Sequence, residues 1–473
     1  MTRRLSRFWL ALIVIVVLGF GVRAVSMALW APHKLPDTVL LDCPSYKVYL
    51  CGDAVYYHDA ANLLADGKGF IDPYRYQYGG KETVTLANGT TTEVITPIGH
   101  IEPTAGHPPV YVLYLSVFSA LGLQSIAAHQ IASILLGCGS ILLAGLLGRS
   151  WRNERTGLIA AFLAAVYANV WINDTAVMSE TAAIFFTFAA TLVGLRFVRD
   201  PSRRNAAFFA VVAALAALSR AELILFLPIV AAVALWRAPL PWRERFIRYG
   251  IAGLVCCAVL APWVVRNNVV MEERVTLSDG AGTVMVQANC DETYYGPHIG
   301  YWSLPCGFPQ PYGPNGELLD ESQRDVVVRE RATAYISNHK ARLLTVVVPA
   351  RIGRMWGLYE PLEQIRLDIG EGRPSIPAKL GFVQYVLLVP AALAGAVIQW
   401  RRRQPVLVVG LWVVLATITA ATAFGTTRYR TAAEVSIVMF SAITIEAIWL
   451  LIQRKRKSDE SLENDSAEMA SFR

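Results

Sequence analysis

The sequence has few charged residues and lacks the patterns of several common protein classes. Charged side chains make up 17% of its 473 residues, whereas 54% are hydrophobic. The hydrophobic residues form long runs instead of the short alternations of a soluble core, which excludes a soluble globular protein. Internal repeats and charged residues in the middle of the apolar runs, which would favour a transporter, are not evident.

The long apolar runs predict an all-α polytopic membrane protein, because about 20 apolar residues cross a bilayer core of roughly 30 Å. The first run, Phe8 to Trp30, is too long for a signal peptide and has no clear cleavage site, so we expect a retained anchor. Val110 to Gly122 is short, and we expect it to lie along the outer surface. Nine further predicted spans, ten in total, cover residues 127–148, 156–176, 180–198, 204–219, 222–237, 247–265, 380–400, 405–424 and 432–452.

Short clusters of arginine and lysine between these runs account for the net charge of +7. They are typical of topology signals and not of a nucleic-acid-binding face. Ten spans place every cluster in the cytoplasm and leave two extracytoplasmic segments. The predicted divisions are 1–30 (cytoplasmic N-terminus and first helix), 31–126 (first outer segment), 127–265 (helices two to seven), 266–379 (second outer segment), 380–452 (last three helices) and 453–473 (a cytoplasmic tail, disordered after Lys457).

The seven cysteines fit this topology. Cys138, Cys256 and Cys257 lie in apolar runs, and the other four lie in the outer segments. An oxidising outer compartment would let Cys43 pair with Cys51 and Cys290 with Cys306. Unpaired or zinc-bound thiols are the alternative, but the spacing is poor for zinc.

Two motifs of the first outer segment carry candidate chemistry. Apolar residues at helical spacing follow Asp53, which predicts that this carboxylate stands at a helix start, where it could also serve as a cap. Further on, Glu102 and His107 precede two prolines that suit a helix N-terminus. Each residue alone could be an ordinary helix cap or loop residue. Because both motifs lie in the same outer segment, a functional role becomes more favoured.

The order of motifs resembles the GT-C fold membrane glycosyltransferases, a group that includes protein O-mannosyltransferases and the aminoarabinose transferase of lipid A. The resembling stretches are Gly52-Asp53 through Gly67-Lys-Gly-Phe70, Pro103-Thr-Ala-Gly-His-Pro-Pro-Val-Tyr111, Ser219-Arg-Ala-Glu222, Pro262-Trp-Val-Val-Arg-Asn267 and Arg428-Tyr-Arg430. They extend over nearly the whole chain. The resemblance implies a GT-C-like helix bundle with juxtamembrane helices and two extracytoplasmic segments.

The resemblance also implies an inverting transfer of a sugar from a polyprenyl-phosphate carrier to an acceptor hydroxyl. Asp53 matches the position of the general base, and Glu102 is a second acidic candidate. Some relatives hold a metal ion here, but Asp53, Glu102 and His107 do not establish a metal site, so we expect no required cofactor. About twenty residues and a cysteine pair separate the first helix from Asp53, more than relatives often have, and the predicted disulfide would fold this insertion back.

Several basic residues near the outer face are candidates for holding the donor phosphate, because arginine suits bidentate phosphate contacts. Interfacial snorkelling is the alternative for each. These residues are His107, Arg220, Arg266, Arg428 and Arg430. Candidate substrate or lid residues are Tyr56, Tyr57, Glu180, Glu222, Tyr294, Tyr301 and Trp302.

The second outer segment also contains Ala341 to Trp356, which we expect to form an amphipathic surface helix with Arg342, Arg351 and Arg354. No glycine-rich phosphate-binding turn is present, so the donor is expected to be lipid-linked and not a nucleotide sugar. The expected partners are this donor, membrane lipids and a glycan, lipid or protein acceptor, without nucleic acid. The expected location is a bacterial plasma membrane with the active site facing outward; a transporter or flippase of lipid-linked saccharides is the alternative.

Overall fold

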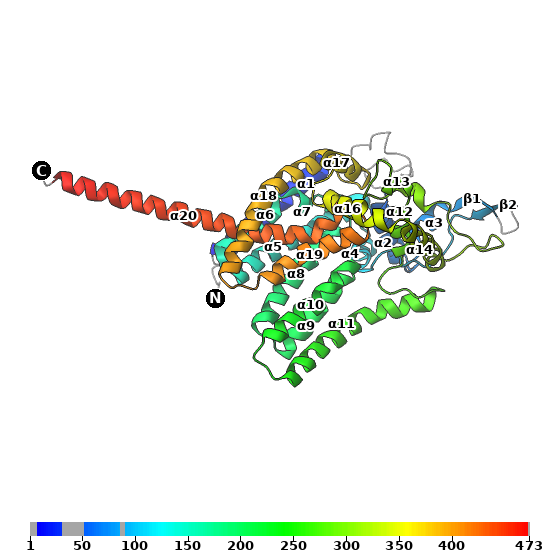
Figure 1. Cartoon of the computed structure of the whole chain (residues 1–473), viewed down its shortest axis with the longest axis horizontal. Helices are drawn as coiled ribbons and strands as arrows, with labels where there is room; N and C mark the ends of the chain where they lie inside the picture. Colours follow the sequence, from blue (N-terminus) through cyan, green and yellow to red (C-terminus); the bar gives the residue numbers. More distant parts are fainter. Residues whose placement is uncertain (1–6, 31–51, 86–89, 472–473) are drawn as a thin grey trace.

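The computed structural model describes residues 7–30, 52–85 and 90–471. Long helices form a bundle, short helices and a hairpin gather at one end of it, and α20 extends beyond the other end (Figure 1). The long apolar helices are α1 (Arg7–Trp30), α5 (Ile126–Trp151), α6 (Glu154–Val166), α8 (Glu180–Arg199), α9 (Arg203–Ala217), α10 (Phe226–Arg237), α11 (Trp242–Val270), α18 (Ser375–Arg401), α19 (Val406–Thr422) and α20 (Thr431–Ser471).

Shorter elements connect these helices, and most lie at the end of the bundle that carries the hairpin. They are α2 (Asp53–Ala65), α3 (Pro73–Tyr78), β1 (Gly80–Thr85), β2 (Thr91–Thr96), α4 (Val110–Ala120), α7 (Ala168–Trp171), η2 (Ala221–Leu225), α12 (Ala281–Ala288), α13 (Asp291–Tyr294), η3 (Leu304–Gly307), α14 (Glu321–Asn338), α15 (Lys340–Arg342), η4 (Leu343–Val347), α16 (Val348–Met355), α17 (Pro361–Gly370) and η5 (Thr427–Arg430). Strands β1 and β2 pair antiparallel, with Gly80 opposite Thr96.

Six helices of the described chain, namely α1, α5, α8, α11, α18 and the apolar part of α20, are long and apolar enough to cross a membrane. The predicted all-α membrane architecture is therefore confirmed. Four other predicted spans coincide with shorter helices: α6, α9, α10 and α19 contain 13, 15, 12 and 17 residues. The total of ten spans stays a prediction.

Small residues and stacked rings hold the bundle together. Alanines of α6 and α9 are fully buried and let neighbouring helices approach closely, as is usual in membrane bundles. Where α18 crosses α20, a side chain at Gly395 would collide with the backbone carbonyl of Phe440. The rings of Phe226 in α10 and Trp412 in α19 stack 3.9 Å apart. The core therefore joins helices from both halves of the chain.

The predicted run 156–176 is not one helix, because the chain turns at Tyr167 after α6, forms the short helix α7 and then enters a buried loop. In this loop, Asp174 receives a hydrogen bond of 2.5 Å from the Nε of Arg23, and both side chains are buried. Arg23 also donates to the carbonyl of Gly19. A carboxylate that must meet this arginine inside the bundle cannot continue an apolar span, which explains why the prediction was wrong here.

The outer segments follow several predictions. Val110–Ala120 is a short helix, and the predicted disulfide joins Cys290 to Cys306. Cys43 and Cys51 lie outside the described residues. The stretch 341–356 is helical, but it is not a surface helix with solvated arginines: Arg351 and Arg354 are buried and donate to backbone carbonyls. Paired in this way, the two arginines anchor the second outer segment.

The predicted disordered tail is also corrected. Helix α20 continues through Lys457 to Ser471, and Figure 1 shows it projecting from the bundle. The segment 431–471 contains no proline or glycine, so nothing in it interrupts the helical hydrogen bonds.

Candidate active site

Helix α2 places Asp53 at the mouth of the candidate site. Its first turn follows Gly52, whose φ of 53° favours glycine and whose carbonyl accepts a 2.5 Å hydrogen bond from Tyr74. The side of α2 behind Asp53 is buried. Tyr57, one turn along, donates to Ser179 at 2.9 Å and packs against Tyr111 of α4. These contacts fix the helix start, and therefore the carboxylate.

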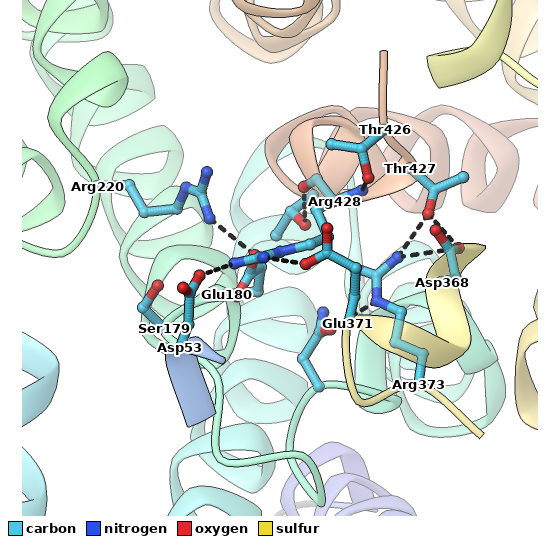
Figure 2. Close-up of polar contacts among 12 residues, drawn as sticks. Asp53, Ser179, Glu180, Arg220, Asp368, Glu371, Arg373, Thr426, Thr427 and Arg428 are labelled. Atoms are coloured by element: carbon cyan, nitrogen blue, oxygen red, sulfur yellow. Dashed lines mark hydrogen bonds and ion pairs between the residues drawn. The ribbon is translucent and has the colours of Figure 1, made fainter. Parts of the chain in front are cut away.

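Arg428 lies at the centre of the site (Figure 2). Its guanidinium donates to Asp53 at 2.7 Å, to Glu180 at 2.6 Å and to Glu371. The arginine comes from η5, just before α20, and Glu180 begins α8, so two long helices and α2 converge on one cation. Four distant parts of the chain thus supply this centre.

Arg220 extends the charged cluster. It donates to Glu180 at 2.8 Å and to Glu222 at 2.6 Å, and its guanidinium lies 5.5 Å from the centre of the Tyr429 ring. A small pocket beside this pair is lined by both Arg220 and Arg428. The two cations therefore border one space.

His107 lies on the other side of Asp53, with its Nε2 3.7 Å from the carboxylate, and it contacts the rings of Tyr56 and Tyr57. Burial, aided by the positive charges of Arg428 and Arg220, lowers the pKa of His107 despite the opposing effect of Asp53. The imidazole is therefore neutral at pH 7. It can accept or donate a hydrogen bond without adding charge.

The electrostatics of Asp53 are dominated by its neighbours. Burial alone would raise its pKa, but Arg428, with smaller contributions from His107 and Arg220, holds the pKa of Asp53 well below its ordinary value. Asp53 is thus ionised at any physiological pH. Its side chain is still about one-third exposed, so a substrate can reach it.

Glu371 was not among the residues predicted from the sequence. It follows α17 and ties the second outer segment to the site, because it accepts hydrogen bonds from the hydroxyl of Tyr301 at 3.1 Å and from the indole of Trp302 at 2.9 Å. The loop that carries these two aromatics is closed by the disulfide between Cys290 and Cys306. Its sequence surroundings, a polar stretch that also contains Glu363 and Asp368, gave no signal that would single it out.

A second network supports Arg428 from behind. Arg373 donates to Thr427 at 2.6 Å and to Asn173 at 3.1 Å, and Thr427 donates to Asp368 at 2.5 Å (Figure 2). Because Thr427 directly precedes Arg428, this network fixes the backbone from which the central arginine extends.

The loop before Glu180 is strained. Val177 adopts a φ of 56°, a left-handed conformation that costs a β-branched residue about 1–3 kcal/mol. The loop is held by the contact of Ser179 with Tyr57 and by the hydrogen bond from Thr181 to Asp174 at 2.8 Å. Such strain is common where a backbone must present a functional side chain.

Three other predicted site residues, Glu102, Arg266 and Arg430, are bound to partners outside the cluster around Arg428. Glu102 forms ion pairs with Arg75 at 2.7 Å and with Arg324 at 2.8 Å. Arg266 donates to the backbone carbonyls of residues 104 and 70. Arg430 is buried against Glu434 at 2.6 Å. Their placement does not support the second-acid and phosphate-binding roles predicted for them.

Tyr294 also lies apart from Asp53, with its hydroxyl donating to Asn289 at 2.7 Å. The residues that the structure brings together are therefore Asp53, Tyr56, Tyr57, His107, Glu180, Arg220, Glu222, Tyr301, Trp302, Glu371 and Arg428. Within residues 7–30, 52–85 and 90–471, no group of three or more His, Cys, Asp or Glu residues is placed to hold a metal ion.

Comparisons with known proteins fit this arrangement. Residues 106–265 match the family of dolichyl-phosphate-mannose-protein mannosyltransferases. The fold matches the oligosaccharyltransferase of Archaeoglobus fulgidus in its apo form, with a TM-score of 0.51 and 12% identity over 97% of this chain and 52% of that one. No curated protein sequence matches significantly.

A second match is the archaeal oligosaccharyltransferase AglB from Archaeoglobus fulgidus in complex with an inhibitory peptide and a dolichol-phosphate. Here the TM-score is 0.52 and the identity 14%, over 96% of this chain and 52% of that one. The chain thus spans about half the length of these oligosaccharyltransferases. The predicted resemblance to GT-C fold membrane glycosyltransferases is confirmed, and the protein has the GT-C fold.

Proposed function

We propose that the protein transfers a sugar from a polyprenyl-phosphate carrier to an acceptor hydroxyl at the outer face of a bacterial plasma membrane. The observation that carries this proposal is the contact of Asp53 with Arg428, beside Arg220 and His107. A potential base and two phosphate-binding cations meet at the ends of membrane helices, where the head group of a lipid-linked donor would lie.

The donor phosphate would compete with the carboxylates around Arg428. Arginine binds phosphate through two parallel N–H groups, and the guanidinium of Arg428 is now shared by three acidic residues. Glu180 is fully buried and stays with Arg428 and Arg220, whereas Asp53 is partly exposed. The phosphate therefore replaces Asp53 as a partner of Arg428.

This exchange would activate the base. A carboxylate whose pKa lies far below 7 is a weak proton acceptor, and general-base catalysis improves as the pKa approaches the working pH. Once the phosphate takes over Arg428, the main factor that depresses the pKa of Asp53 is weakened. Donor binding then prepares Asp53 to accept the proton of the acceptor hydroxyl.

The reaction is a single displacement. As the acceptor oxygen attacks the anomeric carbon, its proton passes to Asp53 and the bond from that carbon to the phosphate oxygen breaks. The electron pair leaves with polyprenyl phosphate, whose growing negative charge is stabilised by Arg428 and Arg220. One displacement inverts the configuration at the anomeric carbon.

The faces of Tyr301 and Trp302 are suited to the apolar side of a sugar ring. Their hydrogen bonds to Glu371, which is itself a partner of Arg428, hold them near this arginine. We assign them to sugar binding. The sugar and the acceptor, whether glycan, lipid or protein, are to be identified by assay.

The test is transfer of labelled sugar from a panel of polyprenyl-phosphate donors by the purified protein. Asp53→Asn should lower the rate by about 10²- to 10⁴-fold, since this is what a general base contributes. The matched control is Asp59→Asn, which changes the other aspartate of α2, a buried residue that does not contact Arg428. It should keep most of the activity.

Near-normal transfer by Asp53→Asn would exclude Asp53 as the base. Equal losses in both variants would mean that only the packing of α2 matters. If the wild type moves the intact carrier lipid across a vesicle membrane without transferring sugar, the protein is a flippase and not a transferase.

A further inference from the structure

A cavity of about 140 Å³ lies at the end of the bundle opposite Asp53. It is formed by the last turns of α8 and α10 and by the start of α19. Helix α8 begins at Glu180 in the active site and ends at Arg199 on the rim of the cavity. Twenty residues at 1.5 Å per residue span about 30 Å, the thickness of a bilayer core. The cavity therefore opens at the other face of the membrane.

The rim of the cavity carries positive charge without a carboxylate partner. Arg237 is exposed and makes no hydrogen bond or ion pair with another residue of the described chain. Arg199 donates only to neutral acceptors, the carbonyl and hydroxyl of Ser150 and the carbonyl of Trp151. Both guanidiniums remain available to an anion.

The surroundings reinforce this charge. The stretches 196–204 and 237–248 together contain eight arginines and two acidic residues. Asp200 accepts from Ser202 and Asn205, and Glu244 is paired with Arg203 and Arg248. Neither of these two acidic residues therefore neutralises the rim.

The walls of the cavity are apolar and include Val230, Ala234, Leu407 and Val408. A free phosphate ion would contact the rim and leave these walls uncovered. A ligand with an anionic head and an apolar chain would satisfy both parts.

Exposed aromatic rings mark the level of the lipid head groups beside the cavity. Trp236 precedes Arg237, and its ring lies 5.5 Å from that of Trp242, which in turn lies 6.0 Å from Phe246. All three rings are more than half exposed. Such belts sit at the membrane interface, so Arg237 is at the depth of a phospholipid phosphate.

We propose that this cavity binds one anionic phospholipid of the membrane leaflet opposite the active site. The phosphate contacts Arg199 and Arg237, and one acyl chain lies against the valine, alanine and leucine walls. Basic pockets between membrane helices are known to hold anionic lipids in this way. The site is separate from Asp53 and does not depend on the proposed transfer reaction.

The experiment measures binding of phosphatidylglycerol to the purified full-length protein in neutral detergent, by native mass spectrometry and by the rise in apparent Tm. Phosphatidylcholine is the neutral comparison. We expect preferential binding of phosphatidylglycerol, weakened about fivefold by Arg237→Ala and further by adding Arg199→Ala, since each basic residue near the head groups adds roughly that factor. Arg243→Ala, an exposed arginine at the same end that does not line the cavity, should change nothing.

A second variant tests the apolar walls with the rim intact. Val233→Trp would fill the cavity and should lower phosphatidylglycerol binding without altering the Tm of the lipid-free protein. Equal binding of phosphatidylcholine, equal weakening by Arg243→Ala, or full binding in Val233→Trp would each overturn the proposal. A Tm rise with inorganic phosphate alone would indicate a phosphate site, and stronger binding of undecaprenyl phosphate would assign the cavity to the carrier lipid instead.

Discussion

The two ends of the helix bundle are both rich in arginine, but the arginines bind different partners. At the end that carries Asp53, Arg428 and Arg220 are shielded and surrounded by carboxylates. At the opposite end, Arg199 and Arg237 are exposed and have no acidic partner within the part of the chain that the structure describes. Basic clusters that orient a membrane protein need only face water. Arg428 and Arg220 are enclosed with acids and line one pocket, so orientation does not account for them, and we propose that they bind the donor phosphate.

The largest effect is expected from removing Arg428, the central cation of the Asp53 end. Arg428→Ala leaves Asp53, Glu180 and Glu371 together without it, so we expect loss of transfer and a fall of about 3–5 kcal/mol in the free energy of unfolding. Thermal unfolding in detergent measures the second effect. The matched control Arg243→Ala should stay within about 0.5 kcal/mol of the wild type.

A double variant separates the two consequences. Arg428→Ala combined with Glu180→Gln removes one of the stranded charges and should recover part of the stability but none of the activity. If activity returns with stability, Arg428 only supports the fold.

A conservative substitution gives a smaller effect. Arg220→Lys keeps the charge but loses the forked geometry that binds phosphate and carboxylate together. We expect the donor KM to rise about tenfold with a smaller change in kcat. Arg237→Lys, at the opposite end, should leave both constants unchanged; an equal rise in KM there would mean that the assay reports lipid binding in general.

A pH dependence tests a pair of carboxyls near the site, Asp279 and Glu321, which have few basic neighbours to offset their charge. Burial raises the pKa of Asp279 to about 6, and burial together with Asp279 raises the pKa of Glu321 well above its usual range. Asp72 and Asp325 add negative charge, and Arg324 opposes it weakly. Both carboxyls therefore hold their protons more tightly in the folded protein.

A raised pKa stabilises the fold below the ordinary value of 3.8, and this stabilisation of Asp279 is lost as the pH rises through about 6. We expect the apparent Tm of the wild type to fall between pH 5 and pH 7.5 by more than that of Asp279→Asn. Glu321 accepts a hydrogen bond from the backbone of residue 105, so its environment bears on the loop that carries His107. Parallel pH curves for the two proteins would contradict this assignment.

The smallest effect is expected from metal removal. If Arg428 and Arg220 hold the donor phosphate, transfer should stay within about twofold after treatment with EDTA, because the guanidiniums supply the positive charge. Restoration of a lost activity by Mg²⁺ or Mn²⁺ would show that the cluster needs a metal ion as well.

Part of this site could be predicted from the sequence, because individual motifs indicate it. Asp53 follows a glycine and begins a helical pattern, and Arg220 and Arg428 stand near the predicted outer face, where orientation requires no arginine. The structure brings Asp53 and Arg428 into contact across 375 positions of sequence. Resemblance of the motifs supplied that long-range link, since local periodicity carries no information about it.

Other parts could not be predicted, because their partners are distant and unmarked. Glu371 stands in a polar stretch like many others until Tyr301, Trp302 and Arg428 surround it. The pairing of Arg23 with Asp174 has no local signature either. Conversely, Arg266 and Arg430 matched the expected pattern, but Arg266 donates to backbone carbonyls and Arg430 is paired with Glu434.

The ion pair between Arg23 and Asp174 has a consequence for biogenesis. Arg23 lies in the first membrane helix, and its partner is made 151 residues later. At about 5–20 residues per second, the ribosome needs roughly 8–30 s to reach Asp174. A lone arginine inside the bilayer costs at least about 2.5 kcal/mol, so we expect α1 to stay near the interface or the translocon until Asp174 is made. Its final docking is then a late event, coupled to the arrival of the loop after α7.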